Sequence, residues 1–190
     1  MKVSEAFEFF LRYVRNPASV GAVCPSSRFL ARKMAAAARA ALRENCVVAE
    51  LGSGTGAITR YLLSELPIEP ENLYCVEFDK ASFEVLKNKF ARARVFNDSA
   101  ENLGRILGAD AGRLACVVSC LPLLSLPEKC VENILGSVES LLPSGGVFIQ
   151  FTYNLFSPSA QKFLPNMEHA GKDFTLLNIP PARIDVFRKR

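Results

Sequence analysis

Short apolar runs alternate along the chain with longer segments of helical periodicity. Seven runs have the length and composition of β-strands, at residues 47–51, 73–78, 94–97, 114–119, 147–152, 174–178 and 184–188. Helical patterns lie near residues 56–65, 80–90, 100–107 and 128–142. Because strands that alternate with helices form parallel sheets, this order predicts an α/β fold with helices on both faces of the sheet. We expect the last two strands to form an antiparallel pair, joined by a turn at Pro180 and Pro181.

Two further helices are predicted before the sheet, at residues 3–15 and 28–43, with Ser26 or Ser27 as the N-cap of the second. The first has an apolar face flanked by cations; the face comprises Val3, Phe7, Phe10, Leu11 and Val14. Residues 1–46 hold eight basic and three acidic residues, a net charge of +5, whereas the remainder carries −1. We therefore expect residues 1–45 to form a helical cap that meets the substrate or an anionic membrane surface. A helix packed on the domain, with a solvated basic face, gives the same pattern.

Length and composition narrow the class of protein. A chain of 190 residues fits a single domain, with residues 46–190 as its main part. No apolar run reaches the roughly 20 residues of a membrane-spanning helix, and Glu5 and Glu8 interrupt any signal peptide, so we expect a cytoplasmic protein. The six cysteines form no C-x-x-C pair and His169 is the single histidine, so we expect buried thiols and no metal site.

A glycine-rich loop follows the first predicted strand, in the stretch VVAELGSGTGAIT at residues 47–59. Glycines there allow a tight turn and a close approach to a ligand, at the start of a helix with free N–H donors. The pattern indicates a nucleotide-like cofactor, and with Ala57 it also satisfies the dinucleotide spacing. Glu77, at the end of the second strand, is placed to bind ribose hydroxyls with either cofactor. Glu50 decides between them, because a carboxylate there repels a pyrophosphate and attracts the positive groups of S-adenosylmethionine.

Residues 97–100 read NDSA at the tip of the third strand. The carboxylate of Asp98 is placed to accept a hydrogen bond from an adenine amino group. Asp98 as a helix N-cap explains the same residue without a ligand, and both roles are compatible.

In these motifs the sequence resembles the class I S-adenosylmethionine-dependent methyltransferases. More narrowly, it resembles the bacterial phospholipid N-methyltransferases that methylate phosphatidylethanolamine. The family-specific stretches are PSSRFLA, LPLLSLP and QFTY, and the resemblance covers roughly residues 5–190. It implies a Rossmann-like, seven-stranded, mostly parallel sheet with one reversed strand and extra N-terminal helices. We assign to the cofactor site Glu50, Gly52, Ser53, Gly54, Thr55, Gly56, Glu77, Phe78, Asp98, Ser99, Ala100 and Ser119. Ser53 and Cys120 depart from the family, which often has proline and glycine there.

The loop VVSCLPLLSLP at residues 117–127 contains no ionisable group except a thiol. Methyl transfer from a sulfonium needs alignment of the acceptor more than a base, and an apolar loop favours the neutral, nucleophilic form of an amine. We expect the backbone carbonyls of Ser119, Cys120 and Leu121 to orient the acceptor, with Tyr153 facing a methylated, cationic amine. Ser119, Leu121 and Tyr153 are therefore the catalytic candidates, although the loop is also explained as ordinary core.

The sequence offers more than one candidate for the anion-binding residues and for the methyl acceptor. Candidate anion-binding residues are Ser26, Ser27, Arg28 and Arg183, for the cofactor carboxylate or a lipid phosphate. We expect a monomer that associates peripherally with the inner membrane and acts on a phospholipid. An RNA adenine methyltransferase, a small-molecule amine methyltransferase and a non-enzymatic membrane recruiter are the alternatives. Leu121 speaks against a nucleobase acceptor, because related enzymes place a polar residue before the loop proline, and so do Leu123 and Leu124, where an aromatic would stack the base.

Overall fold

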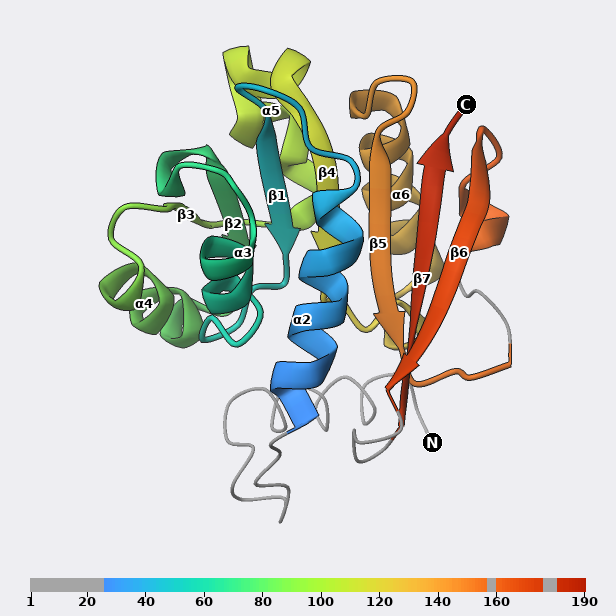
Figure 1. The fold of residues 1–190 in the computed structure, drawn as a ribbon, viewed down its shortest axis with the longest axis horizontal. Helices are drawn as coiled ribbons and strands as arrows, with labels where there is room; N and C mark the ends of the chain where they lie inside the picture. The colour runs from blue at the N-terminus through green and yellow to red at the C-terminus, as the bar shows by residue number, and fades with distance from the viewer. Residues whose placement is uncertain (1–25, 157–159, 176–180) are drawn as a thin grey trace.

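The computed structural model describes residues 26–156, 160–175 and 181–190, except for the side chains of Ser26 and Ser27. These residues form one sheet flanked by helices (Figure 1). The strands are β1 (Val47–Leu51), β2 (Leu73–Glu77), β3 (Arg94–Asn97), β4 (Leu114–Ser119), β5 (Val147–Thr152), β6 (Met167–Thr175) and β7 (Ala182–Lys189). The α-helices are α2 (Ser26–Arg39), α3 (Thr59–Glu65), α4 (Lys80–Lys89), α5 (Leu103–Leu107) and α6 (Glu128–Leu141).

The sheet has the strand order β3-β2-β1-β4-β5-β7-β6. All neighbours pair in parallel except at β7, which runs antiparallel to both β5 and β6. Six strands therefore end at one edge, where the arrowheads of β1, β5 and β6 point in Figure 1, and β7 begins there. The predicted seven-stranded sheet with one reversed strand is confirmed. The order turns back between β1 and β4, and the loops that follow these two strands meet at the same edge, where α/β proteins bind ligands.

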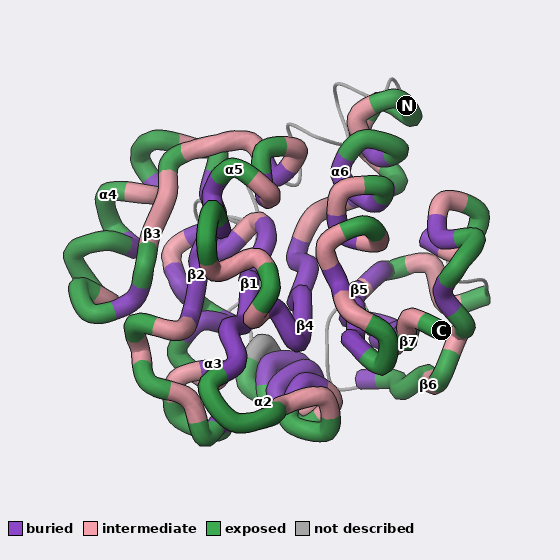
Figure 2. The backbone as a smooth tube through the Cα atoms, turned by 90° about the horizontal axis from the view of Figure 1, so that it is seen from above, coloured by how far each residue is buried: buried purple, intermediate pink, exposed green. Residues whose placement is uncertain are grey.

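Helices cover both faces of the sheet, as the alternating pattern predicts. Figure 2 shows α2 and α3 on one side of the strands and α5 and α6 on the other. Each face has its own apolar core: Leu86 of α4 joins Leu62 of α3 in one, and Leu103 of α5 joins Leu135 of α6 in the other. Every residue of β1, β2 and β4 is buried. The sheet is thus a rigid two-sided frame for the loops at its carboxyl edge.

Several element boundaries differ from the sequence prediction. Helix α3 begins at Thr59, because the left-handed Gly56 (φ +89°) precedes it. Helix α2 begins at Ser26, so Ser26 and Ser27 lie in its first turn and the prediction that one of them is the N-cap was wrong. It also ends at Arg39, four residues early, in a tighter turn where the Ala41 N–H donates to the Ala38 carbonyl. Strand β6 begins at Met167, seven residues before the predicted start.

The predicted interfacial helix at residues 3–15 lies outside the described part of the chain. Within the described ranges, no helix is long and apolar enough to cross a bilayer. The second predicted N-terminal helix exists as α2, and it buries Leu30, Met34 and Ala38 against the sheet and its neighbouring helix α3. The described half of the N-terminal segment is therefore part of the main core.

Candidate active site

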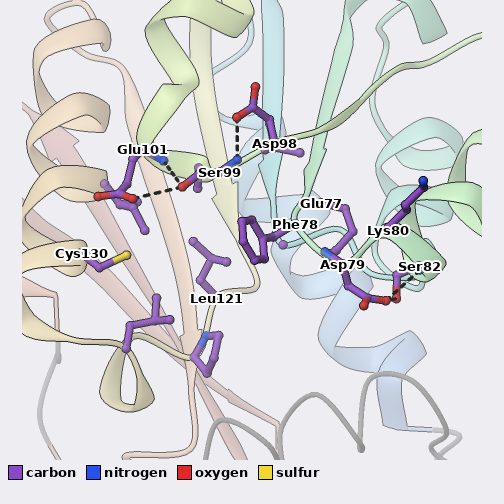
Figure 3. A pocket seen from close by; sticks show the side chains of 16 residues that line it. Glu77, Phe78, Asp79, Lys80, Ser82, Asp98, Ser99, Glu101, Leu121 and Cys130 are labelled. Atoms are coloured by element: carbon purple, nitrogen blue, oxygen red, sulfur yellow. Dashed lines mark hydrogen bonds between the residues drawn. The ribbon is translucent and has the colours of Figure 1, made fainter. Parts of the chain in front are cut away.

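A pocket of about 390 Å³ opens at the carboxyl edge of the sheet. Its size falls in the range of small-molecule sites. It is lined by Gly52, Val76, Glu77, Phe78, Asp79, Lys80, Ser82, Asp98, Ser99, Ala100, Glu101, Leu121, Pro122, Leu126, Cys130 and Ile134. Figure 3 shows these side chains converging from the ends of β2 and β3, the loop after β4 and one face of α6. Seven residues of the predicted site, from four separate stretches of sequence, are thereby brought together.

The glycine loop follows β1 in a conformation that only glycine tolerates well. Gly52, Gly54 and Gly56 have φ angles of +71°, +56° and +89°. A Cβ on Gly52 would lie 2.8 Å from Leu121 Cδ2, and one on Gly56 would lie 2.2 Å from Phe90 Cε2. The glycines therefore let the loop turn back over β2 without side-chain obstruction. The glycine loop then lies against α4 and against residues 120–127, the loop after β4, which is called the acceptor loop below.

Glu77 connects this loop to the end of β2. Its Oε2 accepts the Gly54 N–H at 2.7 Å and its Oε1 accepts the Asp79 N–H at 2.7 Å. Burial raises the pKa of Glu77, and the backbone N–H donors from Asp79 and Gly54 oppose that rise. Each carboxylate oxygen keeps a second lone pair, so Glu77 can order the loop and still accept a ribose hydroxyl.

Glu50 lies at the end of β1, fully buried behind the glycine loop. Its Oε2 accepts from Thr59 Oγ1 at 2.6 Å and from Cys75 Sγ at 3.6 Å. Its Oε1 is buried and has no partner in the part of the chain that the structure describes. Desolvation raises the pKa of Glu50 to about 7, with the Thr59 hydrogen bond opposing the rise. An unpaired buried carboxylate oxygen is costly, and a cationic ligand group satisfies it, so these residues fit S-adenosylmethionine.

Asp98 lies at the tip of β3 and lines the pocket. Its carboxylate accepts from the Asn102 side chain and the Ser99 N–H, each at 2.8 Å, and pairs with Arg105. The Asn102 hydrogen bond contributes most to lowering the pKa of Asp98, so the group is a carboxylate at neutral pH. The N-cap interpretation of Asp98 was wrong, because Ser99 caps the following 3-10 turn (Ala100–Asn102) through the Glu101 N–H. Asp98 is thus an ordered acceptor at the predicted adenine position.

The loop after β4 lies against the glycine loop and is fixed from two sides. The Cys120 N–H donates to the Leu51 carbonyl at 2.8 Å. The Leu121 carbonyl accepts from the Leu123 N–H at 2.9 Å and from Gln150 Nε2 at 2.9 Å. Because two donors already use the lone pairs of the Leu121 carbonyl, Ser119 and Cys120 are the better remaining carbonyls for orienting an acceptor.

Aromatic side chains rim the same edge. Phe78, directly after Glu77, is 76% exposed and lines the pocket, so one ring face is available to stack on an adenine. Tyr153 follows β5 and is 37% exposed, with its ring packed edge-on against Phe151 at 5.6 Å between centroids. Tyr153 is therefore on the predicted edge, outside the residues that line the pocket.

Of the four candidate anion-binding residues, the structure describes the side chains of Arg28 and Arg183. Arg28 is exposed on α2, with its guanidinium 5.0 Å from the centroid of the Phe29 ring. Arg183 is 3% exposed, and its Nε and NH2 contact Asp185 Oδ1 at 2.8 and 2.7 Å, while NH1 donates to the Leu155 carbonyl. The proposal that Arg183 binds a ligand anion is corrected, because a buried partner already neutralises its charge. Arg28 remains a candidate.

Several site residues were missed by the sequence analysis. Asp79, Lys80 and Ser82 follow Phe78 into α4, and Asp79 caps that helix by accepting the Ser82 N–H. Cys130 and Ile134 contribute one face of α6. The i, i+4 spacing of Cys130 and Ile134 on a helix next to the acceptor loop was the available signal.

The described thiols agree with the expectation that the cysteines are buried and free. Cys46, Cys75, Cys116 and Cys120 are buried and free, and Cys130 is half-buried. In the described ranges, no three residues among histidine, cysteine, aspartate and glutamate gather into a metal-binding group.

The fold is that of the class I S-adenosylmethionine-dependent methyltransferases. Among solved structures, the chain is similar to the N-methyltransferase NodS from Bradyrhizobium japonicum, with a TM-score of 0.70 and 11% identity over 88% of this chain and 89% of that one. It is also similar to TrmN from Thermus thermophilus, with a TM-score of 0.64 and 19% identity over 83% of this chain, and it spans 48% of that longer chain.

In sequence, the chain is similar to an ornithine lipid N-methyltransferase from Singulisphaera acidiphila. The two are 28% identical over 156 residues, which cover 79% of each. No protein-family model matches the chain.

Proposed function

We propose that this protein is an S-adenosylmethionine-dependent N-methyltransferase that acts on the amine headgroup of a membrane lipid, phosphatidylethanolamine or its methylated forms. One observation carries the proposal. The buried carboxylate of Glu50, with one oxygen unpaired among the described residues, lies behind the glycine loop. That loop contacts the loop after β4, which has no acid, histidine or lysine before Glu128. The first feature suits a cationic methyl donor, and the second suits an amine acceptor that must be neutral to react.

The residues of the chain have separable roles in this reaction. Glu50 and Glu77 hold the ammonium and ribose groups, Asp98 accepts from the adenine, and Phe78 covers its face. The bound cofactor supplies the electrophilic methyl group. Leu121 and Pro122 exclude water from the acceptor side, which lowers the pKa of an alkylammonium and raises the population of the free amine. Alignment of the acceptor by the backbone at Ser119 and Cys120 provides the remaining catalysis.

A lipid acceptor is supported by two further features. The ornithine lipid N-methyltransferase that resembles this chain carries a lipid amine in its name. Of six large hydrophobic side chains that are exposed in the described residues, five lie at the carboxyl edge: Phe78, Leu124, Tyr153, Phe156 and Phe174. Exposed apolar groups around a site mouth are typical of an interaction surface, and a lipid headgroup must be reached at a bilayer. We propose that this edge, together with the basic segment at residues 1–45, meets the anionic surface of the inner membrane.

The test is methyl transfer from labelled S-adenosylmethionine to separate pools of acceptor. Vesicles with phosphatidylethanolamine, vesicles with ornithine lipid, transfer RNA and a panel of small amines are each incubated with the protein. Label in the lipid fraction is expected, and its release as methylated headgroup identifies the acceptor atom. Label confined to RNA or to soluble amines would refute the lipid proposal while keeping the methyltransferase activity.

A further inference from the structure

A buried amide side chain, that of Gln150, interrupts the apolar part of strand β5. Gln150 is 2% exposed, in the stretch VFIQFT, and pairs in register with Ser119, the last residue of β4. Its backbone position belongs to the sheet, but its side chain reaches the loop that follows β4. Burying an amide in such a strand costs free energy unless each of its polar atoms is satisfied.

The orientation of the Gln150 amide is fixed by its surroundings. Nε2 donates to the Leu121 carbonyl at 2.9 Å and also to the Phe151 carbonyl. Both partners are acceptors only, so a flipped amide would set its oxygen against two carbonyl oxygens. Oε1 is therefore the atom that points away from both carbonyls, and it is buried with no hydrogen-bond partner among the described residues.

The position of Oε1 indicates what satisfies it. It is bonded to the same carbon as Nε2, so it lies one amide width from the atom that holds the Leu121 carbonyl. The Leu121 side chain lines the pocket and meets the glycine loop. The residue opposite Gln150 in β7 is Asp185, a carboxylate that is already held by Arg183 and His169 and cannot donate. Among the described residues no donor pairs with Oε1, yet the loop after β4 is adjacent.

We propose that Gln150 binds the methyl acceptor, with Oε1 accepting an N–H of the amine that is methylated. The assignment rests on the proposed function as an amine methyltransferase. In the reaction, the nitrogen lone pair forms the new N–C bond as the S–C bond of the sulfonium breaks, leaving a neutral thioether and a cationic nitrogen that loses a proton to water. An N–H on that nitrogen becomes more acidic as charge develops, so its hydrogen bond to Oε1 strengthens in the transition state.

The number of N–H groups on the amine distinguishes a direct role of Gln150 from a role in supporting the loop. A neutral primary amine has two N–H groups, a secondary amine has one and a tertiary amine has none. Gln150 therefore assists the first and second methyl transfers and gives no hydrogen bond to the third. A residue that only supports the loop affects all three alike.

The experiment compares Gln150→Met with Gln150→Glu on vesicles of phosphatidylethanolamine and of its monomethyl and dimethyl forms. Methionine matches the shape and removes both polar atoms. Glutamic acid, neutral when buried near pH 7, keeps an oxygen acceptor and one donor. We expect the kcat/KM of Q150M to fall at least tenfold below that of the wild type on the primary and secondary amines. This loss should be at least tenfold greater than any loss on the tertiary amine. We expect Q150E to keep most of the wild-type activity.

The binding of S-adenosylhomocysteine reports whether each variant is folded, and it should stay within a few-fold of the wild-type affinity. Should Q150M fail that check, Gln150→Asn replaces it, because asparagine withdraws the oxygen by one methylene and is expected to show the same amine-dependent loss. Equal losses on all three amines, or equal activity of Q150M and Q150E, would overturn the assignment of Gln150. A wild-type protein that methylates none of the lipid amines overturns the proposed function instead.

Discussion

Thr59 Oγ1 donates to Glu50 Oε2 at 2.6 Å, whereas the other carboxylate oxygen of Glu50 has no partner among the residues that the structure describes. Thr59 is the first residue of α3, so the helix that follows the glycine loop fixes the carboxylate at the end of β1. One oxygen of Glu50 is thus held by the structure, and under the proposed function the other serves the cationic part of the cofactor. This division makes the protonation state of Glu50 a control on both cofactor binding and stability.

Cofactor affinity should fall as the pH is lowered through 7. The pKa of Glu50 in the free protein is about 7, so below that pH the group is mostly neutral and a cationic ligand must first displace its proton. We expect the dissociation constant of S-adenosylmethionine to rise towards tenfold per pH unit between pH 6.5 and 5.5. Calorimetry at pH 6 in buffers of different ionisation enthalpy should show about one proton released per bound cofactor.

Glu50→Gln is the matched control, because it keeps the shape and removes the ionisation. Its affinity should be lower at pH 8 and nearly independent of pH from 5.5 to 8. A wild-type affinity that does not change over this range would show that Glu50 does not meet the cationic part of the cofactor.

The same carboxylate should destabilise the ligand-free protein at alkaline pH. The pKa of Glu50 is raised in the folded state, so the folded protein binds the proton more tightly than the unfolded chain. Its contribution to stability is therefore fully present below about pH 4.5 and is lost as the pH rises through 7. A rise of this size corresponds to about 3 kcal/mol, and Glu50→Gln should recover much of it at pH 8 but little at pH 5. Urea unfolding of both proteins at the two pH values measures this difference.

The sequence predicted the elements whose local pattern and tertiary environment agree. Strands β1 and β4 were placed to the residue because continuous apolar runs between turn signals match strands buried on both faces. Strand β6 was misplaced because its residues from 168 to 174 are exposed or half-buried and mostly polar, so it contains no apolar run of its own. Its extent is set by pairing with β7, from Met167 opposite Lys189 to Thr175 opposite Ala182.

In the candidate site, residues with a local sequence signal were likewise predicted, whereas several contacts without such a signal were not. Gly52, Glu77 and Asp98 were found because each follows a recognisable strand, and strand ends meet at one edge. The contact of Gln150 with the Leu121 carbonyl was not predicted, because the two residues are 29 positions apart. The ion pair of Arg183 and Asp185, two residues apart on β7, was also missed. A lone glutamine within VFIQFT, and two charges that alternate with apolar residues in ARIDVF, were the visible signs of buried polar contacts.

Gly56→Ala should destabilise the protein by more than an ordinary surface change. The residue has φ of +89°, and its new Cβ would lie 2.2 Å from the Phe90 ring, so the loop or α4 must shift. Strain at such a position costs on the order of 1–3 kcal/mol, with further loss from the displaced ring. Gly136→Ala, in α6, has no heavy atom within 4 Å of the added Cβ and should instead stabilise by up to about 1 kcal/mol. Thermal unfolding separates the two, and equal effects would contradict the steric argument.

Asp185→Asn should leave the buried Arg183 without its counter-charge. Arg183 and Asp185 side chains are 4% and 1% exposed, and they lie 2.7 Å apart. Removing one partner of such a pair costs roughly 3–5 kcal/mol. The exposed pair Lys129–Glu132 is the control, and Glu132→Gln should change stability by less than about 0.5 kcal/mol. Denaturant unfolding that gives similar values for both substitutions would mean that water reaches Arg183 in solution.

Replacing both Leu124 and Phe156, two exposed apolar residues of the rim around the site, by serine should weaken binding to vesicles without altering the cofactor site. Leu124 is 63% exposed and Phe156 is 95% exposed, and both lie in loops at the carboxyl edge. Each buried large apolar side chain contributes roughly 1.5–3 kcal/mol, so losing both should lower membrane affinity by at least tenfold. Sedimentation with anionic vesicles measures the affinity, and S-adenosylhomocysteine binding should remain at the wild-type level.

The control is Val85, which is 39% exposed in the middle of α4 and is not among the residues that line the pocket. Val85→Ser removes a similar kind of surface and should leave vesicle binding unchanged. Added salt should weaken the wild-type protein through its basic segment, but the loss caused by the rim substitutions should persist at high salt because it is hydrophobic. If the double substitution and Val85→Ser bind vesicles equally well, the rim does not enter the membrane, and the lipid must then be reached through residues 1–25 alone.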